Sequence, residues 1–123
     1  MGMMKRERSL LLDKSEAFSG RILKMYKYLS SDKNELIISK QILRSGISIG
    51  ANISESRNAQ SNADFINKLN IALKEADETL YWIKILHNGE YINEKEYESI
   101  YNDADELVKL LVSSIKTLKQ KNG

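Results

Sequence analysis

The chain has 123 residues, and its 19 Lys and Arg nearly balance its 17 Asp and Glu, leaving a formal net charge of +2. This length suits one compact domain, which we expect to span residues 1–123. There is no Cys and no Pro, which excludes disulfides and thiolate metal sites and favours long uninterrupted helices. No apolar run approaches the ~20 residues of a membrane span, and no signal peptide is recognisable. We therefore expect a cytoplasmic protein that has no membrane partner.

The small net charge conceals an asymmetry between the two halves of the chain. Residues 1–61 hold 11 basic and 6 acidic residues, a net of +5, whereas residues 62–123 hold 8 and 11, a net of −3. Solvated helical faces that partly neutralise each other explain this pattern. A basic surface for an anionic partner such as RNA explains it too.

Apolar spacing predicts four helices, the first two at about residues 11–30 and 35–57. Apolar side chains in the first recur at steps of three and four and form one stripe, made of Phe18, Ile22, Met25, Tyr26 and Leu29. A polar break follows at residues 31–34. One face of the second helix carries Ile38, Ile42, Ile49 and Ile53, with Gly46 in the same row.

The third helix is expected at about residues 62–87. Ser61 followed by Asp64 indicates a capped N-terminus, and Asn88-Gly89 indicates the end, with Gly89 as the residue just past the helix. Apolar residues occupy much of the circumference of this helix. That breadth fits a subunit interface, and it also fits a deeply central helix.

The fourth helix is expected at about residues 94–119, with Asn93 and Glu96 repeating the capping pattern. Its apolar residues keep a helical spacing from Tyr97 to Leu118. Because the connections are short, neighbouring helices should be antiparallel. The predicted fold class is therefore all-α, an up-and-down four-helix bundle.

The segment from Arg44 to Glu55 is the least ordinary part of the chain. Glycine in a helix interior costs about 0.5–1 kcal/mol relative to Ala, so Gly46 and Gly50 indicate another helix packed close against this one. The segment also brings potentially buried polar residues together, and carboxylates on the third helix can face them. We expect these residues to form a structural polar network that fixes bundle and oligomer register: Arg44, Asn52, Glu55, Glu75 and Glu78.

Chemistry for an enzyme is poorly represented. There is no nucleophile elbow, P-loop or dinucleotide fingerprint. His87, the only histidine, falls near a helix C-terminus, where an imidazole suits the loose carbonyls. Glu75 and Glu78 on the third helix, with Glu55 on the second, resemble the carboxylates of a di-iron bundle, but such sites need Glu-x-x-His motifs on two helices. We expect no catalytic residue, no metal and no cofactor.

Basic side chains are spread over the first two helices and are candidates for contacting phosphates. They are Arg21, Lys24, Lys27, Lys40, Arg44 and Arg57. Tyr28 lies among them and can stack on a base. A solvated face is the plainer explanation of the same pattern.

Taken together, these residues resemble the four-helix bundle family that includes the 23S rRNA intervening-sequence proteins and the accessory proteins of diversity-generating retroelements. The resemblance covers about residues 36–118. Its centre is Arg44-Ser45, followed by Ser48-Ile49-Gly50-Ala51-Asn52-Ile53-Ser54-Glu55, and it continues through Asp64-Phe65 and the turn at residues 91–94. Two departures are Ser56 in place of the family's usual Gly and the lack of a Trp-containing opening.

The resemblance implies an antiparallel bundle that assembles into a homopentameric barrel. It also implies association with nucleic acid or a ribonucleoprotein for some members, and no enzyme activity. The sequence therefore predicts a non-catalytic oligomeric protein that binds structured RNA or a ribonucleoprotein. The alternative is a protein–protein scaffold or adaptor without a nucleic-acid role, which the acidic second half and the broad apolar surface of the third helix favour.

Overall fold

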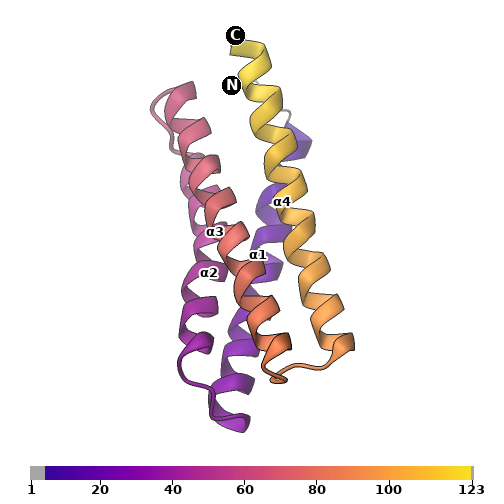
Figure 1. The fold of residues 1–123 in the computed structure, drawn as a ribbon. Coiled ribbons are helices and arrows are strands. Elements are labelled where there is room, and N and C mark those ends of the chain that lie inside the picture. The colour runs from indigo at the N-terminus through magenta and orange to yellow at the C-terminus, as the bar shows by residue number, and fades with distance from the viewer. Residues whose placement is uncertain (1–4, 123) are drawn as a thin grey trace.

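The computed structural model describes residues 5–122, which form four long α-helices and no strand (Figure 1). The helices are α1 (Lys5–Lys27), α2 (Ile38–Ser56), α3 (Asn62–Asn88) and α4 (Glu94–Asn122). A π-helical turn, η1 (Tyr28–Asp32), continues directly from α1. The prediction of an all-helical four-helix protein is confirmed.

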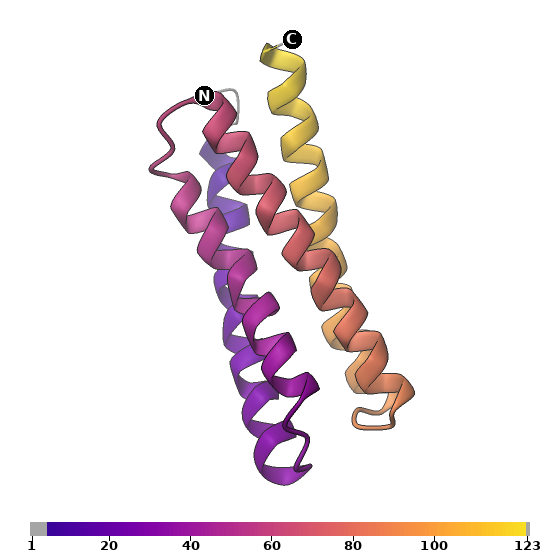
Figure 2. The same cartoon turned by 60° about the vertical axis from the view of Figure 1, so that its left-hand side comes forward.

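The helices run alternately up and down along a common axis (Figures 1 and 2). The packing of α2 on α3 is the most extensive, that of α1 on α2 and of α3 on α4 follows, and α1 packs on α4 much less. Because the helices alternate in direction, the C-terminal end of α1 lies at the same end of the bundle as the α3–α4 turn.

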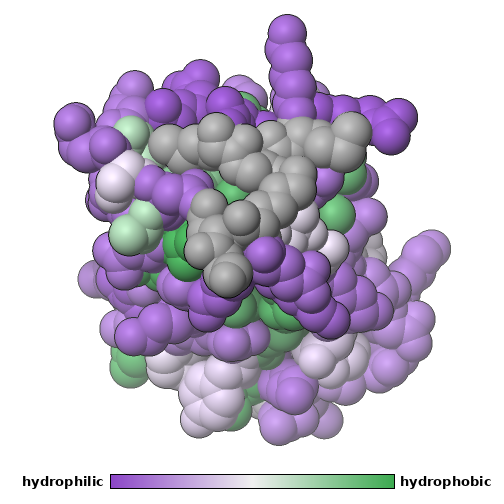
Figure 3. Space-filling view, turned by 90° about the horizontal axis from the view of Figure 1, so that it is seen from above, coloured by the Kyte–Doolittle hydropathy of each residue, from purple (hydrophilic) through white to green (hydrophobic). Residues whose placement is uncertain are grey.

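The core consists of aliphatic and aromatic side chains that recur at helical spacing on all four helices. Ile22 of α1, Ile49 of α2, Leu69 of α3 and Leu111 of α4 are completely buried. Seen from the end that carries the chain termini, most of the outline is hydrophilic, and hydrophobic residues show between the polar ones (Figure 3). No helix within residues 5–122 is both long and apolar enough to cross a membrane.

The two glycines of α2 are the places where α1 comes closest. A Cβ on Gly46 would lie 2.9 Å from both γ-carbons of Ile22, and one on Gly50 would lie 3.3 Å from the carbonyl oxygen of Ser15. The expected close approach of another helix to these glycines is confirmed. Any larger side chain would push α1 away from α2.

The first helix begins at Lys5 and not near Leu11, as the apolar spacing had predicted. Its first turns are polar, so they carry no periodic signal, although they contain no helix breaker. Arg8 gives them a tertiary contact, because its guanidinium lies 5.4 Å from the centre of the Phe65 ring. The predicted end near Ser30 also differs, since η1 carries the helical turns on to Asp32.

The second helix begins at Ile38, later than predicted, because Glu35 serves as its N-terminal acceptor. The buried carboxylate accepts the backbone N–H of Ser39 at 2.6 Å and that of Ile37 at 3.1 Å. These bonds satisfy donors that have no partner inside the helix. Asn34, just before it, has a φ of 54°, a conformation that Asn tolerates well.

Both predicted helix caps are confirmed. The hydroxyl of Ser61 accepts the N–H of Asp64 at 3.1 Å, and Asn93 and Glu96 exchange reciprocal side chain–backbone bonds of 2.8 and 2.9 Å. The expectation for Gly89 was wrong in detail. Gly89 has a φ of −82°, and the left-handed residue is Glu90, with a φ of 66°.

Gly46→Ala should destabilise the fold. Overpacking costs about 1–3 kcal/mol, which exceeds the ~1 kcal/mol gained from better helix propensity. Gly20→Ala is the matched control, because an added Cβ there meets nothing within 4 Å, so it should raise stability by about 0.5–1 kcal/mol. Urea unfolding measures both. Equal gains from the two changes would contradict the proposed close contact of α1 with α2.

Candidate nucleic-acid interface

The six basic residues predicted to contact nucleic acid do not form one patch. All six are exposed, but Lys40 lies in the first turn of α2 and Arg57 is its C-cap. At ~1.5 Å rise per residue these two positions are roughly 25 Å apart along the helix. Arg57 donates to the carbonyl and hydroxyl of Ser54 at 3.2 and 3.1 Å, so it closes the end of α2.

Arg21 connects α1 to α4. Its guanidinium donates to the carboxylate of Asp103 at 2.6 Å and to the hydroxyl of Ser99 at 3.1 Å. Further along the same seam, Lys14 pairs with Glu106 at 3.1 Å. These two pairs supplement the limited packing between α1 and α4.

Arg44 connects α2 to α3 and meets both predicted carboxylates. It donates to Glu75 at 3.0 Å and also to Glu78. The indole N–H of Trp82 donates to the same Glu78 oxygen at 2.9 Å, a partner that the sequence analysis missed. The pair is not buried as expected, since 50% of the Arg44 side chain is exposed, so each bond adds only about 0–1 kcal/mol.

These contacts shift the pKa values of Glu78 and Arg44 in the directions that keep both side chains charged. The Trp82 indole is the main reason that the pKa of Glu78 lies below its usual value, burial opposes the shift, and Arg44 adds to it. The hydrogen bond to Glu78 is likewise the main cause of a raised Arg44 pKa. Arg44 is therefore committed to the α2–α3 seam and is a poor candidate for a phosphate.

The other two members of the predicted polar network lie elsewhere. Asn52 donates to the carbonyl of Ser48 at 2.8 Å, within its own helix. Glu55 is exposed and pairs with Lys68 of α3 at 3.1 Å. Arg44 and Glu55 are separated by about 16 Å along α2, so they cannot share a partner. The structure brings together Arg44, Glu75 and Glu78 only.

The buried polar contact of this seam is made by Ser45 and Thr79, which were not among the residues predicted for the polar network. The hydroxyl of Thr79 lies 2.9 Å from that of Ser45 and 2.8 Å from the carbonyl oxygen of Glu75. Both side chains are completely buried, so Ser45 needs Thr79 as its hydrogen-bond partner, whereas Thr79 also bonds to the carbonyl oxygen of Glu75. Only the helical register of α2 against α3 reveals this pair.

Lysines without ion pairs gather at the end of the bundle where α1 passes into α2. Within the part of the chain that the structure describes, no ion pair involves Lys24, Lys27, Lys33 or Lys40. All four are exposed, and Lys24 and Lys27 occupy the last turn of α1. Of the nearby acids, Glu35 is buried and already bonded to backbone N–H groups. Asp32 is exposed, and Glu90, Glu94 and Glu96 line a groove together with Lys33. We define these four residues as the lysine corner.

A groove of about 510 Å³ runs beside the lysine corner, between α1 and α4. It is lined by Arg21, Lys24, Met25, Tyr28, Ile92, Lys95, Glu96, Ser99 and Ile100. The sequence analysis found three of the lining residues, Arg21, Lys24 and Tyr28. It missed Lys95 and the isoleucines, because only the antiparallel packing of α1 and α4 brings them alongside.

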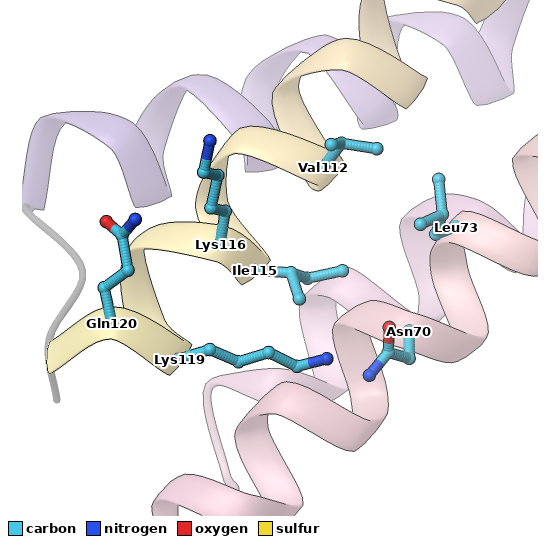
Figure 4. Close-up of a pocket in the computed structure, with 7 residues that line it drawn as sticks. All are labelled: Asn70, Leu73, Val112, Ile115, Lys116, Lys119 and Gln120. Atoms are coloured by element: carbon cyan, nitrogen blue, oxygen red, sulfur yellow. The ribbon is translucent and has the colours of Figure 1, made fainter. Parts of the chain in front are cut away.

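A second groove lies between α3 and α4, towards the other end of the bundle (Figure 4). Leu73, Val112 and Ile115 give it an apolar surface, and Lys116 and Lys119 flank this surface. Val112 remains 48% exposed. None of the predicted nucleic-acid-binding residues lines this groove.

His87 has a structural position at the α3–α4 turn. Its Nε2 atom lies 2.8 Å from a carboxylate oxygen of Glu94, and its ring stacks on Tyr97 with centroids 4.1 Å apart. No group of three or more His, Asp or Glu side chains in residues 5–122 is arranged to hold a metal ion. The groups that the groove beside the lysine corner presents to a ligand are lysine ammonium groups next to the ring of Tyr28.

A family model described as 23S rRNA-intervening sequence protein matches residues 7–113. The chain belongs to this family. It is also similar to a crystal structure, at 1.70 Å resolution, of a protein with unknown function from the S23 ribosomal protein family of Bacteroides thetaiotaomicron. The two are 57% identical over 89% of this chain and 98% of that one, with a TM-score of 0.88. No curated protein matches.

The motif from Arg44 to Glu55 lies within the residues that match the 23S rRNA-intervening sequence protein family. In this member the motif supplies the glycines under α1, the Ser45 hydroxyl and the Arg44 bridge to α3. Each of these contacts is within the bundle. The motif therefore specifies how α2 packs against α1 and α3. The residues that are available for binding a partner are surface residues outside the motif.

Trp82→Phe should raise the pKa of Glu78 towards its usual value, because it removes the main donor to that carboxylate. A lowered native pKa stabilises the fold above the unfolded value, near 4.5, and this contribution disappears as pH falls through the native pKa. The variant should therefore lose less stability on acidification than the wild type. Carboxyl NMR titration measures the shift directly. Tyr81→Phe, on the neighbouring exposed ring, is the control, and an unchanged Glu78 titration in Trp82→Phe would contradict the assignment.

Proposed function

We propose that this protein is a non-catalytic, cytoplasmic RNA-binding bundle that recognises structured RNA or a ribonucleoprotein. The observation that carries the proposal is the lysine corner: four exposed lysines at one end, without ion pairs among the described residues. Binding phosphates releases counterions, which favours such a surface strongly at low salt. Membership of a family named for 23S rRNA supports the choice of RNA.

Self-association is the second part of the proposal, and a homopentameric barrel is the assembly that we favour. Several large apolar side chains remain exposed, which a subunit interface would cover. Val112 on α4 is 48% exposed, and Leu10 on α1 is 39% exposed. A solution mass of five chains is the direct test. Assembly would multiply the lysine corners that one RNA can meet.

A protein–protein scaffold is the alternative function. The groove between α3 and α4 supports it, because its apolar surface and flanking lysines suit an acidic amphipathic helix (Figure 4). The RNA proposal ranks higher because the lysine corner gathers four exposed lysines that have no ion pair among the described residues, and such a surface needs a partner rich in negative charge.

Binding to a fluorescein-labelled RNA stem-loop, measured by anisotropy at several salt concentrations, tests the function. The logarithm of affinity should fall linearly with the logarithm of salt concentration. The double variant Lys24→Glu, Lys27→Glu should weaken binding by about 10-fold or more and reduce the slope by roughly 1–2.

The matched control is Lys116→Glu, Lys119→Glu, which changes the net charge equally at the opposite end of the bundle. It should bind within about 3-fold of the wild type if the lysine corner makes the contacts. Equal losses in both double variants would mean that total charge alone matters. A wild type that binds no RNA at about 50 mM salt would contradict the function and favour the scaffold.

A further inference from the structure

The groove between α1 and α4 has an apolar floor that phosphate binding does not require. Ile92 and Ile100 are buried at its base, and Met25 and Tyr28 are half-buried along the α1 side. Its volume of about 510 Å³ falls within the roughly 300–1,000 Å³ of pockets that take small molecules. A planar apolar group of the size of a nucleobase fits these dimensions.

Positive charge surrounds this floor on both sides. Lys24 on α1 and Lys95 on α4 both line the groove and are exposed, and no ion pair within residues 5–122 involves either. Arg21, also in the lining, is held in place by Asp103. Two lysines, one on each helix that lines an apolar floor, suit a ligand that has a flat apolar part and anionic groups.

Tyr28 supplies an aromatic face where the groove meets the lysine corner. It belongs to the first turn of η1 and also lines a neighbouring groove at the α3–α4 turn. The Lys33 ammonium lies over its ring, 5.7 Å from the centre, so a base that stacks on Tyr28 must use the other face or displace Lys33. Stacking of a base on such a ring is tolerant of sequence, because every base has a π-face.

The one carboxylate in the groove is fixed and can accept hydrogen bonds from a base. Glu96 is held because its Oε1 atom accepts the N–H of Asn93 at 2.9 Å. A carboxylate repels phosphate but accepts amino or imino hydrogens from a base edge. The base therefore belongs near Glu96 and Ser99, and the phosphates belong near Lys24 and Lys95.

We infer that this groove binds an unpaired nucleotide of RNA, with its base against Tyr28 and its phosphates at Lys24 and Lys95. The inference rests on the proposed function and specifies its ligand as single-stranded loops or ends. In a duplex the faces of the bases are covered by their neighbours, so they cannot reach Tyr28. An acidic peptide is the competing occupant, and it needs no base.

The experiment compares a fluorescein-labelled single-stranded 12-nucleotide RNA with a duplex of the same sequence. The wild type should prefer the single strand by roughly 10-fold. Tyr28→Leu keeps apolar bulk but removes the ring, so it should abolish this preference, and Tyr28→Phe should recover it. Tyr81→Leu, at an exposed tyrosine on another face, is the matched control and should bind as the wild type does. Circular dichroism establishes that each variant is folded.

Lys95→Glu is a second variant that tests the groove, and because Lys95 is exposed it leaves the packing of the bundle unchanged. It should weaken single-strand binding by roughly 5-fold or more. Equal binding of both RNAs, or full binding by both Tyr28→Leu and Lys95→Glu, would overturn the groove while leaving RNA binding intact. Failure of the wild type to bind either RNA would overturn the proposed function, and this inference with it. Displacement of bound RNA by poly-glutamate, with no preference between the two RNAs, would favour the peptide.

Discussion

The contact of α1 with the two glycines of α2 is the constraint on which the rest of the structure depends. A Cβ on Gly46 would lie 2.9 Å from the γ-carbons of Ile22, so a side chain there would force the buried Ile22 side chain or α1 itself to shift. This contact sets the level of α1 against α2. It thereby determines the position in the bundle of the C-terminal end of α1. That position in turn determines where the lysine corner and Tyr28 lie relative to α4. The glycines cost helix propensity and stabilise the fold through packing instead.

The polar contacts of the bundle divide into two kinds. Ser45 with Thr79 and Glu35 with the start of α2 are buried, so their loss would leave polar groups without partners. Arg44 with its carboxylates and Arg21 with Asp103 are largely exposed, so solvent screens them. The exposed pairs orient the helices and remove two arginines from the surface available to RNA. What remains for an anionic partner is mainly lysine.

Sequence alone predicts most of the fold, because helical periodicity and capping are local. The caps at Ser61 and Asn93 were predictable from residues three positions apart. The start of α1 was not, because its first turns are polar and are held by a tertiary contact between Arg8 and Phe65. Neither was the role of Glu35, since a carboxylate that caps from before the helix looks like a residue of the helix itself.

The candidate site was harder to predict, because it depends on distances across helices. Residue type identified Arg44 as a partner of Glu75 and Glu78, and the structure places them together. The same reasoning added Asn52, which is rotated by about 80° from Arg44 around the helix and bonds to its own turn. It also grouped Lys40 with Arg57, which lie at opposite ends of α2. Lys95 enters the site only through the packing of α4 on α1.

The central claim is that RNA meets the end of the bundle where α1 passes into α2. Ultraviolet cross-linking of bound RNA, followed by mass spectrometry of the peptides, tests it most directly. Cross-links are expected within residues 24–33 and around Lys95, with Tyr28 prominent among them. Cross-links concentrated instead around Arg57, Lys116 and Lys119, at the opposite end, would contradict it.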